Sequence, residues 1–201
     1  MRTLLSQKSI YSNTLLKELL LKQPQYGANE EAKEYKTEEE IRYIRITDID
    51  NLGNLKDNNK KTASVIDTKY LLNYNDLLFA RSGSVGRCYI HKNTSEKAIF
   101  AGYLIRFVLD EEKCHPDYIF YYCNSNLYKY WVSAIERPAV QSNINSEEYK
   151  SMPIPLPPLS KQNEIAQKIQ EIRQKANELK QEATIIIESV KQQIEQMILG
   201  N

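Results

Sequence analysis

Apolar residues recur with helical spacing through the C-terminal segment of the chain. The steps between them alternate between four and three residues, which is the a/d pattern of a coiled coil. The positions are Ile165, Ile169, Ile172, Ala176, Leu179, Ala183, Ile186 and Val190. The next d position holds Gln193, with Ile194 and Met197 beyond it, so the repeat shifts near its end. We therefore predict one amphipathic helix across residues 159–199.

No glycine or proline interrupts this segment, with Ser160 as the expected N-cap and Gly200 as the expected end. A helix of about 40 residues spans roughly 60 Å at 1.5 Å per residue. Residues 1–152 form too small a domain to cover so long a stripe. The pattern favours pairing with another helix over folding back onto the chain's own domain.

Residues 1–152 mix shorter patterns of both kinds. Leucine-rich residues 13–22 predict a helix, as do residues 116–122 and 126–135. Alternating apolar residues predict strands within 41–49, on both sides of a glycine turn within 76–90, and within 98–109; an acidic loop is expected at 30–40. The fold class is therefore α+β, a globular mixed α/β domain followed by one long coiled-coil helix.

Four prolines mark the boundary between these two parts, at positions 153, 155, 157 and 158. Their spacing forbids helix and favours a stiff, extended connector. The predicted organisation is a domain at 1–152, a proline-rich connector at 153–158, and a long helix for antiparallel pairing and spacing at 159–201.

Charge is uneven along the chain although the net charge is only +1. Residues 60–108 carry eight Lys and Arg against three acidic residues, whereas residues 30–57 carry nine acidic residues against five basic ones. One basic face on a neutral molecule is a modest indication of a polyanionic partner. Three irregularly spaced cysteines and the absence of a long apolar run indicate a cytoplasmic protein without a disulfide framework.

The sequence shows few signs of an active site. It has no phosphate-binding loop, no Gly-x-Gly-x-x-Gly after a strand, and no Asn-Pro-Pro-aromatic segment. A zinc site could use Cys88, His91, Cys114, His115 and Cys123, but cysteines in such apolar surroundings are more often small core residues. We expect no metal and no catalytic residue in this chain.

A loose nuclease pattern is also present in Pro116-Asp117 followed by Glu148 and Lys150. Metal-dependent nucleases need such carboxylates gathered around Mg²⁺. Asp117 is expected at the start of one helix and Glu148 in another, so a stand-alone nuclease is an alternative rather than our first interpretation.

The segment ARSGSVGRCYI places two glycines and two serines between Arg81 and Arg87. Amides and hydroxyls exposed in such a turn can bind phosphate or base edges, and an arginine can bind guanine through two hydrogen bonds. An ordinary hairpin turn with solvated arginines explains the same pattern equally well.

Several segments together resemble the specificity subunit of type I restriction-modification enzymes. They are YIRITDID at 43–50, the strand and turn at 75–86, the helix at 116–122, residues 141–144, and the proline-rich exit at 152–159 followed by Gln162. Their order covers most of the chain, at roughly residues 12–198. A full specificity subunit resembles two such units in tandem, whereas this chain has one, so it resembles a half-subunit.

The resemblance implies a sequence-specific DNA-recognition subunit that is not itself an enzyme. It would bind double-stranded DNA and direct a methyltransferase subunit that uses S-adenosylmethionine, and a restriction subunit driven by ATP, with Mg²⁺ also in the partners and no cofactor in this chain. The residues expected to contact DNA are Arg45, Arg81, Ser82, Gly83, Ser84, Gly86, Arg87, Lys92, Gln141, Ser142 and Asn143.

The heptad residues named above would then form the dimer interface. Two copies on a two-fold axis would place two identical domains at opposite ends of an antiparallel coiled coil, and read a bipartite, gapped palindromic site. A coiled-coil scaffold whose front domain binds protein is the second alternative. The sequence gives neither the target bases and spacer length nor the identity of the partner half.

Overall fold

The computed structural model describes residues 10–135 and 143–200. Ten short strands and four α-helices make up this part of the chain, with β1–β9 before the first α-helix and β10 between the third and the fourth. The strands are β1 Asn13–Leu15, β2 Gln25–Tyr26, β3 Ala32–Glu34, β4 Arg42–Ile44, β5 Lys61–Ala63, β6 Leu77–Ala80, β7 Cys88–Ile90, β8 Ala98–Phe100, β9 Leu104–Phe107 and β10 Pro153–Pro155. The helices are α1 Pro116–Tyr122, α2 Asn126–Ile135, α3 Ser146–Lys150 and α4 Leu159–Leu199, with single 3-10 turns at Leu16–Leu19, Ile46–Asp48 and Thr68–Tyr70. The α+β class is confirmed.

The largest sheet has four antiparallel strands in the order β2-β9-β6-β7. Strand β6 lies inside it and is buried along its whole length, pairing Leu77 with Phe107 on one side and with Ile90 on the other. Smaller pairs flank it: β4 with β8 in parallel, and β3 with β5 and β1 with β10 antiparallel. The hairpin β6–β7 therefore begins from the most buried strand of the domain.

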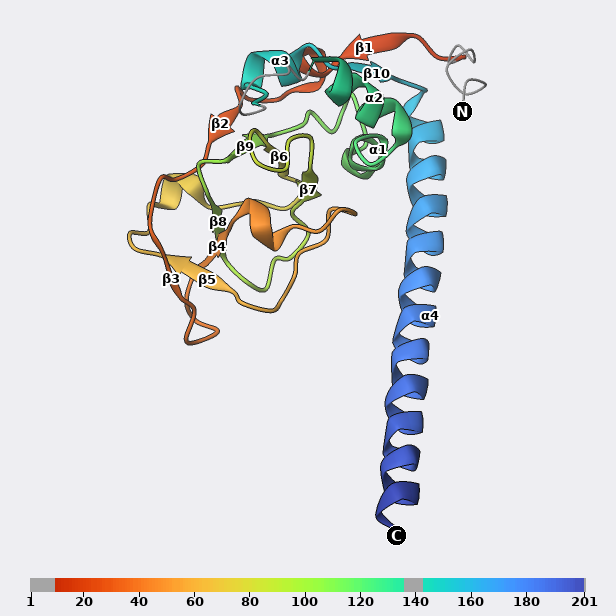
Figure 1. Cartoon of the computed structure of the whole chain (residues 1–201). Coiled ribbons are helices and arrows are strands. Elements are labelled where there is room, and N and C mark those ends of the chain that lie inside the picture. The colour runs from red at the N-terminus through yellow and green to blue at the C-terminus, as the bar shows by residue number, and fades with distance from the viewer. Residues whose placement is uncertain (1–9, 136–142, 201) are drawn as a thin grey trace.

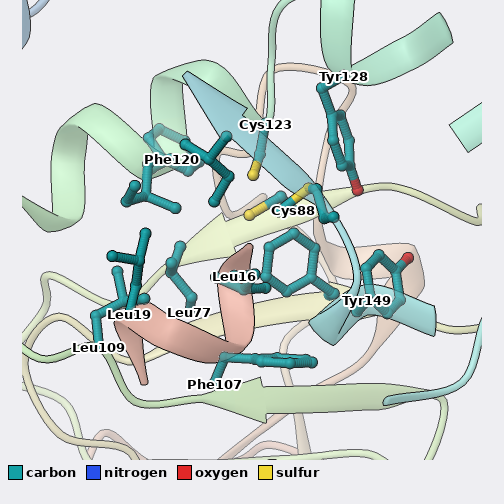
Figure 2. Close-up of a cluster of buried hydrophobic side chains, with 14 of the residues drawn as sticks. Leu16, Leu19, Leu77, Cys88, Phe107, Leu109, Phe120, Cys123, Tyr128 and Tyr149 are labelled. Atoms are coloured by element: carbon teal, nitrogen blue, oxygen red, sulfur yellow. The ribbon is translucent and has the colours of Figure 1, made fainter. Parts of the chain in front are cut away.

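The main core lies between this sheet and helices α1 and α2. Aromatic side chains fill it, with the Phe79 ring packed edge-on against Phe107 and tilted against Tyr149. Figure 2 shows Cys88 and Cys123 side by side in this core, with their sulfurs directed toward one another. Both cysteines are buried and free, as is Cys114. Burial raises the pKa of the Cys114 thiol to about 12, so at neutral pH it is a protonated core residue.

Three features of the domain differ from the sequence-based expectation. The helix predicted at 13–22 is wrong, because Thr14 pairs with Ile154 in the β1–β10 ladder and Leu16 and Leu19 are buried from a single 3-10 turn. The proline-rich segment 153–158 begins extended, as predicted, but its first half is strand β10 of the domain, paired with β1, and not part of a connector. The acidic stretch at 30–40, expected to be a loop, contains strand β3, which pairs Lys33 with Thr62 of β5.

Helix α4 confirms the predicted length and end. Gly200 ends it with a left-handed φ of 72°, while the N-cap is Pro158 and not Ser160. Figure 1 shows that α4 leaves the domain beside α1 and then extends alone, far beyond it. No helix in residues 10–135 and 143–200 combines the length and the hydropathy that a membrane span requires.

The start of α4 is fixed to the domain by polar contacts. The Gln162 side chain is buried, accepts a hydrogen bond from the His115 backbone N–H (2.8 Å) and donates one to the Pro157 carbonyl (2.8 Å). Farther along, the Arg173 guanidinium donates to Asn54 Oδ1 (2.7 Å) and lies over the ring of Phe120. The helix direction relative to the domain is therefore set by its first four turns.

The predicted dimer stripe lies mostly beyond that attachment. Ile165 packs against the core, Ile169 is half-buried, and Ala176 and Ala183 are exposed. The four larger residues are Ile172, Leu179, Ile186 and Val190, with exposed fractions of 60%, 53%, 56% and 46%. So much apolar surface on one helix is typical of a surface that another helix covers.

Candidate nucleic-acid interface

The turn between β6 and β7 is built on two glycines with left-handed backbone. Gly83 has φ of +77° and Gly86 has φ of +79°. A Cβ on Gly83 would lie 3.7 Å from Ile46 Cδ1, which is ordinary contact, whereas a Cβ on Gly86 would lie 2.9 Å from Val132 Cγ2. Gly83 is thus required only by its φ, and Gly86 by both its φ and the close approach of α2.

Two buried tyrosines hold the backbone of this turn. The Tyr149 hydroxyl donates to the Ala80 carbonyl (2.7 Å) and accepts from the Gly86 N–H (3.1 Å). The Tyr128 hydroxyl donates to the Gly86 carbonyl (2.8 Å). Burial raises the pKa of both hydroxyls well above the usual value, so they remain neutral. The turn is therefore rigidly placed at the domain surface.

Arg87 connects the turn to the loop that follows β4. Its guanidinium donates to the carbonyls of Ile49 (2.7 Å) and Ile46 (3.3 Å) and to Asn51 Oδ1 (2.8 Å). These bonds use both terminal nitrogens for contacts within the domain. The observed role of Arg87 is to hold the 46–51 loop; its predicted contact with DNA stays a prediction.

Arg81 begins the same turn and is oriented quite differently. Its guanidinium lies 4.9 Å from the centroid of the Tyr26 ring, and its Nε is 3.4 Å from Asn143 Oδ1. The Tyr26 hydroxyl is itself fixed, since it donates to the Ser146 hydroxyl (3.2 Å) and accepts from the Ser146 N–H (3.1 Å). The described part of the chain provides no partner for the two terminal nitrogens of Arg81.

The predicted loop contact also lies at this turn. Asn143 forms a bridge with Ser82, and the Ile144 N–H donates to the Arg81 carbonyl (2.8 Å). Gln141 and Ser142, which we also predicted to contact DNA, lie outside the described residues. Within the turn, Ser82 is buried, Gly83 is exposed and Ser84 is half-buried. The structure thus brings Asn143 to the turn, and its contact with DNA stays a prediction.

The other two predicted basic residues lie elsewhere. Arg45 is half-buried and its guanidinium binds the Asp48 carboxylate (2.6 Å), beside the groove described below. Lys92 follows β7 at the end of the hairpin opposite the turn, where its amine binds Asp117 (2.8 Å) and Asn75 (2.6 Å). Lys92 is therefore not part of the surface around the turn, and its contact with DNA stays a prediction.

Two open grooves flank the turn. One, of about 530 Å³, runs between the turn and α2 and is lined by Asn51, Ser84, Arg87, Asn124 and Lys129 among others. The second, of about 520 Å³, is lined by Asn29, Arg45, Thr47, Gly102 and Tyr103 among others. The amide, hydroxyl and cationic groups of the first groove suit the edges and phosphates of nucleic acid, whereas Glu30 adds a carboxylate to the second.

Sequence reasoning missed the aromatic residues of this surface. Tyr26 lies under Arg81, and the side chain of Tyr103 is 61% exposed beside the turn, where its carbonyl accepts from the Arg81 N–H (2.9 Å). The only signal in the sequence was the high total of 14 tyrosines, which does not point to individual positions.

The nuclease alternative finds little geometric support. Asp117 forms its ion pair with Lys92, the Glu148 carboxylate caps α3 by accepting from the Asn145 N–H (2.9 Å), and Lys150 pairs with Glu147. In residues 10–135 and 143–200 no three His, Cys, Asp or Glu side chains gather closely enough to hold a metal ion. Each residue of the pattern has a local structural contact instead.

Residues 16–189 match the family described as the type I restriction modification DNA specificity domain. The chain is 30% identical over 127 residues to the type I restriction enzyme MjaX specificity subunit of Methanocaldococcus jannaschii, covering 60% of this chain and 28% of that protein. It is 28% identical over 138 residues to the StySPI specificity subunit of Salmonella potsdam, covering 65% of this chain and 30% of that protein. The chain thus spans less than a third of these relatives.

Solved structures share the fold. The HsdS subunit from Thermoanaerobacter tengcongensis matches with a TM-score of 0.61 at 16% identity, over 84% of this chain and 43% of that one. The S subunit of the type I restriction-modification system from M. genitalium matches with a TM-score of 0.58 at 15% identity, over 87% and 42%. A chain from a structure describing complex assembly of a type I R-M system matches with a TM-score of 0.63 at 14% identity, over 88% and 41%. At these identities the likeness shows the fold alone.

Proposed function

Because this chain belongs to the type I restriction modification DNA specificity domain family, we propose that it recognises double-stranded DNA sequence for a type I restriction-modification complex. The observation that carries the proposal is that the family match runs through both the domain and most of α4. The chain therefore has both a surface for reading DNA and a helix for setting its distance from a second reading domain.

Within the domain, the turn at 81–87 is the proposed centre of DNA contact. The Arg81 guanidinium lies over the Tyr26 ring and donates from Nε to Asn143, and its terminal nitrogens have no partner among the described residues; this geometry suits a phosphate or the O6 and N7 atoms of guanine. Gly83 and Ser84 present backbone and hydroxyl groups beside it. Arg87 supports the surface from within by holding the 46–51 loop.

The chemistry is proposed to belong to partner subunits. A methyltransferase subunit using S-adenosylmethionine and a restriction subunit using ATP would act where this chain binds, and the chain itself would be neither an enzyme nor bound to a cofactor. The local structural contacts of Asp117, Glu148 and Lys150 support this division. A plasmid-nicking assay with the purified chain and Mg²⁺ tests it, and nicking that D117A abolishes would contradict it.

The partner for the exposed stripe on α4 is proposed to be a second copy of this chain. An antiparallel pair would cover the exposed side chains of Ile172, Leu179, Ile186 and Val190 and place the two domains at opposite ends. Two identical domains related in this way would read a gapped palindrome, with unread base pairs between the half-sites.

The experiment is to map adenine methylation across the source genome with and without this gene. Loss of methylation at one gapped motif is the expected result, and a palindromic motif would support the homodimer. A motif with unlike halves would mean that the second recognition domain comes from a different protein and not from a second copy of this chain. No change at any motif, combined with no specific DNA binding by the purified chain, would refute the proposed function.

A further inference from the structure

We infer that an apolar groove beside the start of α4 receives the C-terminal end of α4, residues 194–199, from a second copy of the chain. This inference rests on the proposed antiparallel homodimer and adds a binding site on the domain for the end of the partner's helix. The dimer contact would then join helix to domain as well as helix to helix.

The groove lies where α4 leaves the domain. It has a volume of about 630 Å³ and is lined by Tyr121 and Tyr122 of α1, Leu127 and Trp131 of α2, and Ile169 of α4, together with residues of β1 and β10. The side chain of Leu127 is 51% exposed at its edge. Ile169 belongs to the heptad stripe, so the apolar stripe of α4 runs directly into this groove.

The proposed occupant is the least covered apolar segment of the helix. The exposed fractions of Met197, Ile198 and Leu199 are 82%, 77% and 73%. From Ile169 to Ala183 the apolar stripe is narrow, with only a and d positions, as a single helix partner requires. It widens locally where Ile185 and Ile187 flank Ile186, and again at the end, where Ile194 and Ile198 lie beside the a position Met197. An apolar face that wide is typical of a helix packed against a domain rather than against one helix alone.

Two-fold symmetry brings this end to the groove. When Ile165 lies opposite Met197 of the second copy, Ala176 lies opposite Ile186 and Leu179 opposite Ala183. Each alanine then faces a large side chain, which fills the seam evenly. In the same register the polar d residue, Gln193, lies opposite Ile169 at the edge of the groove, where the stripe passes from the helix onto the domain.

The same chain cannot fill its own groove with this segment. Ile169 and Ile198 are 29 residues apart on one straight helix, which is roughly 40 Å at 1.5 Å per residue. A second copy satisfies the distance because its helix runs in the opposite direction. Parallel pairing would instead bring the two domains together at the same end of the helices.

The test is cross-linking of the full chain with Leu127→Cys and Ile198→Cys on one molecule, using a short bifunctional thiol reagent. The native cysteines Cys88, Cys114 and Cys123 are buried, so the unmodified chain serves as a blank. The matched control combines Leu127→Cys with Gln181→Cys, since Gln181 is exposed at an outward f position near the middle of the helix. We expect a covalent dimer for the first pair and none for the control.

The mass of the unmodified chain in solution, measured by light scattering, shows whether it is a dimer, and so distinguishes failure of this inference from failure of the proposed dimer. A monomeric chain would refute both. The chain could also be a dimer in which the Leu127–Ile198 pair gives no more covalent product than the control. That result would refute binding of the helix end in the groove, but it would be consistent with the homodimer. As a second measurement, Ile198→Asp should weaken dimerisation at least tenfold while Gln181→Asp leaves it unchanged; equal effects would overturn the inference.

Discussion

Replacing each arginine of the turn separately tests which of them contacts DNA and which of them stabilises the domain. Arg81→Ala and Arg87→Ala delete the same side chain and the same charge, six residues apart on one turn. If the turn acted only through its positive charge, both variants would lose the same DNA affinity. The structure instead gives the two guanidinium groups different partners, so we expect different results.

Arg87→Ala should primarily lower the stability of the domain. The substitution leaves the Ile49 carbonyl and Asn51 without their hydrogen bonds from Arg87, at 2.7 and 2.8 Å. Losing hydrogen bonds from a charged donor costs about 1.5–3 kcal/mol each when buried. Because this guanidinium is half-buried, we expect about 2 kcal/mol in total, and a 46–51 loop that exchanges its amide hydrogens faster.

Arg81→Ala should leave stability nearly unchanged and weaken DNA binding. The side chain gives up one long hydrogen bond to Asn143 and its contact with the Tyr26 ring, worth about 1 kcal/mol or less at an exposed site. A two-bond contact with guanine is worth about 1–3 kcal/mol, roughly 5- to 150-fold in affinity. A phosphate contact would instead lower the salt slope by about one, with equal loss on all sequences.

The assays are urea unfolding for stability, and binding to the motif found by methylation mapping against a scrambled duplex of equal length. Affinity should be measured at several salt concentrations, with Arg81→Lys as a third variant that keeps the charge but not the paired donors. If Arg81→Ala binds the motif as tightly as the unchanged chain at moderate salt, Arg81 is not a DNA contact. If Arg87→Ala unfolds at the same urea concentration as the unchanged chain, the assigned structural role is wrong.

Three further outcomes follow from the same structure. Gly86→Ala should cost about 2–4 kcal/mol in urea unfolding, from its φ and the overlap with α2, whereas Gly83→Ala should cost only about 1 kcal/mol; equal costs would contradict the turn geometry. Burial lowers the pKa of His91 below 6.5, so the unfolded chain takes up its proton first. Stability present above about pH 6.5 should fall as the pH drops through the folded pKa, and His91→Gln should flatten the thermal stability profile between about pH 7 and 5. Arg173→Ala should keep the dimer and half-site affinity but bind duplexes of several spacer lengths about equally, which competition among spacer variants measures.

The two best predicted features of the chain both depend on local pattern. Helix α4 was found from its heptads and its missing glycines and prolines, and the β6–β7 turn from Gly83 and Gly86 between apolar runs. The segment at 13–22 failed because its leucines have good helix propensity, yet Leu16 and Leu19 reach the core only when residues 13–15 pair with β10. That pairing lies about 140 residues away in sequence, and no local propensity reports it.

The candidate site shows the same limit at the level of single side chains. Arg81 and Arg87 are equivalent in the sequence pattern, and their different roles come from partners contributed by distant segments. Ile49 and Asn51 reach Arg87 from the loop after β4, while Tyr26 reaches Arg81 from β2. A motif therefore located the turn, but only the fold shows which arginine faces outward.

Reading a gapped site requires more than two surfaces, because the distance between them must also be fixed. A long helix measures distance only if its joint with the domain is stiff. Here Gln162 is bonded on both sides of its amide, and Arg173 is bonded to Asn54 and stacked on Phe120 about three turns later. Two attachments separated along one helix fix a direction, whereas a single attachment would leave a hinge. The first four turns of α4 thus belong mechanically to the domain, and the turn that carries Arg81 keeps a set position relative to the exposed stripe. In the proposed dimer, the spacer length would be determined at this joint as much as by the length of the helix.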